Sequence, residues 1–141
     1  MNQLLLLLIL IPVSTYYLSQ RKNPHLTWRL TGIAFGLVVA PISLCLAKYL
    51  YVPLIGKLIS LFGLGLNLIH GSVGYFMVVS MGLLEPGTPL SAAELILINA
   101  VNGVIWSAYY GFVGFNLDVK WAHAEAGEEV PQGYHREKIV S

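Results

Sequence analysis

The sequence predicts an all-α, polytopic integral membrane protein built as a bundle of four transmembrane helices. Of its 141 residues, 56% are hydrophobic and 11% are charged, whereas about a quarter of the residues in a soluble domain are charged. The charges are also segregated, because residues 30–47, 58–84 and 95–117 contain no Asp, Glu, Lys or Arg. A soluble domain of this length could not bury so much apolar surface. We therefore expect a transmembrane helical domain at residues 1–117 and a polar extramembrane C-terminal tail at residues 118–141.

The first span, residues 4–20, is expected to be an uncleaved membrane anchor. No basic side chain precedes it, whereas Arg21 and Lys22 follow it directly. A signal peptide has the opposite arrangement, and basic loops mark the cytoplasmic side of a membrane. The N-terminus is therefore predicted outside, and four complete spans would place the C-terminus outside as well. The location that we expect is the inner membrane of a bacterium.

The second and third spans, residues 30–47 and 58–84, each carry a face of small or polar residues. In the second span this face is a Gly-x-x-x-Gly pair that continues into an alanine, which lets two helix backbones approach closely. In the third span the face recurs at positions i, i+4, i+7, i+8 and i+11, which lie on one side of a helix. These faces predict helix–helix packing through Gly32, Gly36, Ala40, Gly63, Asn67, Gly71 and Gly74.

The fourth span, residues 95–117, has the clearest predicted start. Ser91 and Glu94 form a capping box, in which each side chain bonds to the backbone N–H of the other residue. One face of the span combines amide, glycine and aromatic residues, and we expect it to pack against another helix. The members of this face are Asn99, Asn102, Gly103, Trp106 and Tyr110.

Four polar side chains lie at predicted membrane depth: Asn67, His70, Asn99 and Asn102. An amide or imidazole facing lipid is costly, so each should face protein, cofactor or water. The simpler interpretation is hydrogen bonding between the third and fourth spans. Alternatively, His70 ligates haem or chlorophyll, because the glycines beside it leave room for a flat ring. Bis-histidine haem would need a second histidine at this depth, and the sequence has none. The single cysteine, Cys45, excludes an intrachain disulfide and a cysteine-rich metal site.

No nucleotide-binding, zinc or nucleophile pattern occurs in the sequence, which predicts that the protein is not an enzyme. Eight Lys and Arg against seven Asp and Glu leave no basic surplus for nucleic acid. We expect an accessory or assembly subunit whose partners are the lipid bilayer and other membrane subunits. Two alternatives remain. One is a subunit that binds lipid or a cofactor (haem, chlorophyll or quinone) at His70, and the other is a homo-oligomeric channel or transporter lined by Asn67, Asn99 and Asn102.

Overall fold

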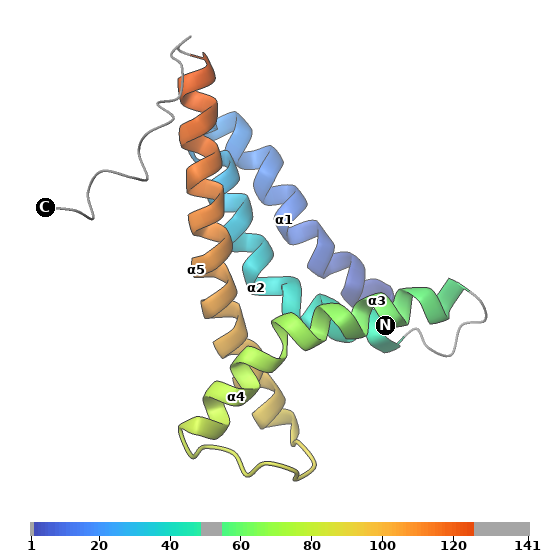
Figure 1. Cartoon of the computed structure of the whole chain (residues 1–141). Coiled ribbons are helices and arrows are strands. Elements are labelled where there is room, and N and C mark those ends of the chain that lie inside the picture. The colour runs from blue at the N-terminus through green and yellow to red at the C-terminus, as the bar shows by residue number, and fades with distance from the viewer. Residues whose placement is uncertain (1, 49–54, 126–141) are drawn as a thin grey trace, which may run out of the picture.

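The computed structural model describes residues 2–48 and 55–125, and every regular element in them is a helix. The elements are α1 (Asn2–Lys22), a short 3-10 helix η1 (Pro24–Leu26), α2 (Thr27–Ala47), α3 (Ile55–His70), α4 (Ser72–Ser80) and α5 (Ala92–Glu125) (Figure 1). Four helical stretches are long and apolar enough to cross a membrane: Gln3–Lys22, Pro24–Ala47, Ile55–Ser80 and Ala92–Ala124. The predicted all-α class is confirmed, together with the length and composition of four candidate spans.

Two boundaries differ from the sequence prediction. The third predicted span, residues 58–84, forms two helices, α3 and α4, which are interrupted at Gly71. The fourth continues past Leu117, so that residues 118–125 of the predicted tail belong to α5. The rest of that tail, residues 126–141, lies outside the described residues. At the interruption, side chains far away in the sequence complete the backbone hydrogen bonding.

The centre of the fold is the antiparallel pair α2 and α5, which lie side by side (Figure 1). Gly114 on α5 contacts the backbone of Trp28 at the start of α2. Further along the pair, Gly32 contacts the backbone of Tyr110, and Gly36 contacts that of Trp106. Without a Cβ atom at these glycines the two backbones approach closely along the N-terminal half of α2.

Helix α1 packs antiparallel on α2 near the loop that joins them. The rings of Tyr16 and Trp28 lie 5.5 Å apart between centroids, and Ser19 is buried beside them. Toward its N-terminus α1 diverges from the central pair (Figure 1). Only 6% of its most apolar 18-residue window is buried, so almost the whole helix is uncovered.

Helices α3 and α4 pack on different members of the central pair. The α3 contacts are on the last turn of α2, where Ser60 Oγ donates to the carbonyl of Ala47 at 2.7 Å and Gly63 lies against Leu46. The α4 contacts are on α5 and centre on a buried cluster of Val78, Leu84 and Ile98. The α3–α4 stretch therefore runs back along α2, turns at Gly71, and then runs outward along the N-terminal part of α5 (Figure 1).

Four complete crossings would make the second and fourth spans parallel, whereas α2 and α5 are antiparallel. The α3–α4 stretch joins these two helices: Ser60 and Gly63 on α3 contact the last turn of α2, and Val78 on α4 packs with Ile98 near the start of α5.

The turn between α4 and α5 has a backbone cap at the end of α4 and a side-chain cap at the start of α5. Gly82 has a φ of +71°, and the N–H groups of Gly82 and Leu83 donate to the carbonyls of Val79 and Val78, which forms a Schellman motif. At the start of α5 the predicted capping box is confirmed. Its two bonds run from Ser91 N–H to Glu94 Oε2 at 2.7 Å and from Glu94 N–H to Ser91 Oγ at 3.3 Å.

Among the described residues, several small or polar side chains are fully buried while many large apolar side chains are exposed, which is the reverse of the pattern in a soluble protein. The most buried positions include Ser43, Ser60 and Asn102, each with no exposed area. By contrast, large apolar side chains on α3, such as Leu61 and Leu68, are 68% and 73% exposed. Helices surrounded by lipid typically place small and polar residues at their contacts with one another and large apolar residues on the outside.

Candidate functional site

The interruption at Gly71 is held together by two side chains of α5. In a continuous helix the Gly74 N–H would donate to the His70 carbonyl. Here the Gly74 N–H donates to Asn102 Oδ1 at 2.7 Å, and the His70 carbonyl accepts from Trp106 Nε1 at 2.9 Å. Asn102 Nδ2 also donates to the Gly71 carbonyl at 3.0 Å. Asn102 and Trp106 are one helical turn apart on α5, so a single face of that helix supplies all three bonds.

These bonds matter because the surroundings offer no replacement. Asn102 has no exposed area, and its amide oxygen and its amide nitrogen both bond the backbone of the interrupted helix. A backbone group left without a partner in an apolar environment costs several kcal/mol, roughly, and an irregular backbone is tolerated in lipid only where protein satisfies it. Gly74 makes the approach possible, because a Cβ atom there would lie 2.6 Å from Asn102 Cγ.

The His70 ring lies at the same junction with both nitrogens engaged. Its Nδ1 is 3.0 Å from the Leu66 carbonyl, and its Nε2 is 2.7 Å from the Tyr110 hydroxyl. A carbonyl only accepts, so Nδ1 carries a hydrogen, and in the neutral ring Nε2 accepts from Tyr110. The Trp106 ring packs against the imidazole at 4.3 Å between centroids. Ligation of haem or chlorophyll would require the nitrogen that Tyr110 occupies.

The other two membrane-depth amides take different partners from the ones expected. Asn67 lies beside α2, with its side-chain oxygen 3.1 Å from Ser43 Oγ, rather than beside α5. Asn99 donates to the Leu95 carbonyl of its own helix at 2.8 Å. Of the four predicted polar residues, His70 and Asn102 therefore bond between the third and fourth spans.

A cavity of about 260 Å³ lies beside the interruption and brings together the three asparagines proposed from the sequence as a channel lining. Its lining contains no carboxylate, so it offers a ligand hydrogen bonds without a negative charge. The polar part of the lining comes from Asn67, Ser72, Tyr75, Asn99 and Asn102, and its remainder from Leu44, Leu68, Gly71, Leu90, Leu95 and Ile98.

The structure also shows what surrounds the other small residues that the sequence predicted at helix contacts. Ala40 on α2 is buried, and a Cβ atom at Gly63 on α3 would lie 2.5 Å from the backbone nitrogen of Ala47. Gly103 is in ordinary contact with Leu37, because a Cβ atom added to this glycine would lie 3.6 Å from the leucine. At Gly71 a Cβ atom would meet the Asn67 side chain of its own helix. The small faces of α2 thus meet α5 and α3, an assignment that the sequence left open.

One buried carboxylate lies outside the region in which the sequence suggested polar contacts. Asp118 on α5 accepts hydrogen bonds from the backbone N–H groups of Trp28 and Arg29, both at 2.9 Å, and is 9% exposed. Those N–H groups belong to the first turn of α2, so Asp118 caps that helix from a different helix. A usable signal was present, since Asp118 follows Gly111 and Gly114 on the same face of α5.

No protein-family model, curated protein or solved structure matches this chain. Within residues 2–48 and 55–125 there is no group of three or more His, Cys, Asp or Glu side chains that could hold a metal ion.

Proposed function

We propose that this protein is a non-catalytic integral membrane subunit that assembles with other subunits into a larger membrane complex, in the cell membrane of a bacterium. The observation that carries the proposal is the use made of the buried polar side chains. Asn102, Ser60 and Asp118 each bond the backbone of a neighbouring helix, and His70 bonds Tyr110. These groups hold the helices together and are not directed at a substrate. The protein then acts through its surface.

The uncovered surface supports association with other subunits. Helix α1 contacts α2 along one side and exposes the large side chains of Leu4, Leu6 and Leu7, each by more than half. In the α3–α4 stretch only 22% of the most apolar window is buried. In a bilayer such faces meet either lipid or a neighbouring transmembrane segment, and association with a segment would depend on close side-chain packing, because lipid tails are as apolar as leucine.

The proposed membrane arrangement has three crossings, α1, α2 and α5, and a re-entrant α3–α4 segment. The α1–α2 loop and the C-terminal end of α5 share one end of the molecule, because Asp118 caps α2 there. That end carries Arg21, Lys22, Arg29 and Lys120. Basic residues favour the cytoplasmic side, so we place the N-terminus outside and the end of α5 inside.

Cysteine labelling tests this arrangement. In a background carrying Cys45→Ala, single cysteines are introduced by Gln3→Cys, Thr88→Cys and Ala124→Cys. A membrane-impermeant maleimide is expected to label the first two in intact cells and the third only after permeabilisation. Labelling of Ala124→Cys in intact cells, at the level of Gln3→Cys, would restore four complete crossings.

Native extraction tests the assignment as a subunit. The tagged chain is extracted with a mild detergent from cells that produce it naturally, and its migration on a native gel is compared with that after strong-detergent treatment. Co-migration with other polypeptides in a fixed ratio is the expected result. A band containing copies of this chain alone would instead favour the homo-oligomeric channel or transporter, and release from membranes by alkaline carbonate would exclude an integral protein.

A further inference from the structure

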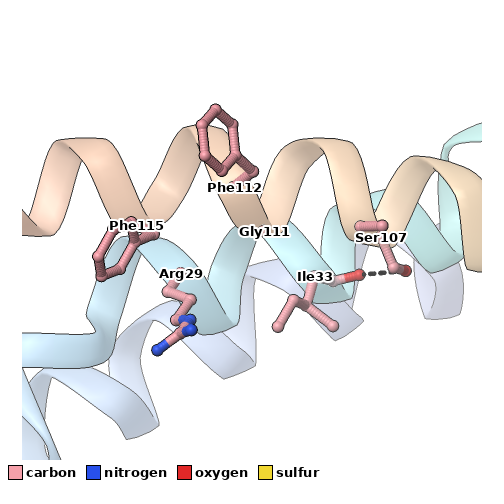
Figure 2. Close-up of a pocket in the computed structure, with 7 residues that line it drawn as sticks. Arg29, Ile33, Ser107, Gly111, Phe112 and Phe115 are labelled. Carbon is pink, nitrogen blue, oxygen red and sulfur yellow. Dashed lines mark hydrogen bonds between the residues drawn. The ribbon is translucent and has the colours of Figure 1, made fainter. Parts of the chain in front are cut away.

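A groove of about 560 Å³ runs between α2 and α5 on a face that no α1 residue lines. Figure 2 shows its two walls, with Arg29 and Ile33 on one and Ser107, Phe112 and Phe115 on the other. The Ser107 hydroxyl donates to the Ile33 carbonyl at 2.9 Å, so this hydroxyl is already bonded within the protein. The wall residues that remain are apolar apart from Arg29.

Small residues of α5 make this groove. Ala108 and Gly111 lie on its α5 wall, one turn apart or less. A Cβ atom at Gly111 would come within 2.7 Å of the Ile33 side chain, so glycine leaves that side chain in place beside the groove. The volume is in the range of roughly 300–1,000 Å³ that is usual for small-ligand sites.

Arg29 provides the one charge in the groove lining, at the end where α2 begins. Its guanidinium carbon lies 5.1 Å from the centroid of the Phe115 ring, so that an aromatic face supports the cation (Figure 2). The nearby carboxylate of Asp118 is occupied by the backbone N–H groups of Trp28 and Arg29. The planar N–H groups of an arginine match the oxygens of a phosphate in a two-point contact.

We propose that this groove binds an anionic phospholipid, with its phosphate on Arg29 and one acyl chain along Ile33, Ala108 and Phe112. Charge complementarity selects this occupant. The end of the molecule that holds Arg29 also carries Arg21, Lys22 and Lys120, and basic clusters at a membrane surface attract anionic headgroups. The apolar part of the groove can hold an acyl chain, which a free phosphate does not have. The inference depends on the membrane location proposed above.

Lipid competition tests the site. The full chain in a non-ionic detergent is mixed with equal amounts of phosphatidylglycerol and phosphatidylcholine carrying the same acyl chains, and retained lipid is counted by native mass spectrometry. We expect preferential retention of phosphatidylglycerol, and a roughly tenfold loss of that preference in Arg29→Gln. Lys120→Gln removes a cation from the same end but outside the groove, and should change the preference by less than about twofold. Ala108→Phe should lower the retention of both lipids.

Each result that would contradict the lipid-binding proposal leads to a different conclusion. Equal losses in Arg29→Gln and Lys120→Gln would assign the preference to general surface charge and overturn the site. Displacement of the phospholipid by inorganic phosphate would overturn the acyl-chain contact. Unchanged lipid retention in Ala108→Phe, with loss of a co-purifying polypeptide, would make the groove a subunit contact instead. Failure of the chain to float with liposomes would refute the membrane location, whereas a floating chain that does not discriminate between lipids would refute only the groove.

Discussion

Replacing Asn102 by leucine is expected to lower the free energy of unfolding by about 2–4 kcal/mol, because each buried polar group left without a partner costs about 1–3 kcal/mol. Leucine has a similar volume but cannot accept from the Gly74 N–H or donate to the Gly71 carbonyl, which Asn102 does at 2.7 and 3.0 Å. Both groups lie at the interruption between α3 and α4. The measurement is reversible unfolding in mixed detergent micelles.

Asn99→Leu is the matched control for this experiment. Asn99 has the same side chain and lies on the same helix, but it donates only to the Leu95 carbonyl of α5 itself. We expect its substitution to change the free energy of unfolding by less than about 0.5 kcal/mol, as is usual for positions without a special contact. Equal effects at Asn99 and Asn102 would mean that the interruption does not depend on α5.

Replacing Gly36 by alanine is expected to destabilise the protein by about 3 kcal/mol, at the upper end of the usual cost of overpacking. A Cβ atom there would overlap the backbone of Trp106 and Ser107 on α5. A backbone cannot rotate out of the way as a side chain can, so the two helices would have to separate along their contact. Thermal or detergent-induced unfolding measures the loss.

Gly65→Ala is a control for which the free energy of unfolding should change in the opposite direction. A Cβ atom at Gly65 on α3 would have nothing within 4 Å, so it adds no clash. Alanine is favoured over glycine inside a helix by roughly 0.5–1 kcal/mol, and we expect a small stabilisation. If both alanines stabilised the protein, the close α2–α5 contact would be refuted.

The glycine faces illustrate what the sequence could predict. The spacing of Gly32 and Gly36 identifies a face on which another backbone can approach, and the structure has a backbone there. The spacing does not identify the partner, because any helix with a small face fits equally well. The expected bonds of Asn67 and Asn99 failed for the same reason, since an amide can bond to α2 or to its own helix.

The interruption at Gly71 could not be predicted from its own segment. A glycine costs a helix little, and the run around it is apolar enough to continue without a break. What completes the interruption is Asn102 and Trp106, which lie 31 and 36 positions from the backbone groups they bond. A prediction made from local periodicity therefore extends α3 through Gly71 without a break.

The cap that Asp118 forms on α2 has a consequence for biosynthesis. The carboxylate lies 90 and 89 positions beyond the N–H groups it binds, and the ribosome therefore makes α2 long before its cap. At a translation rate of about 5–20 residues per second, that delay lasts about 5–20 s. During it, the nascent hairpin of α1 and α2 must keep those amides solvated near the membrane surface, and only the arrival of the last helix closes the fold.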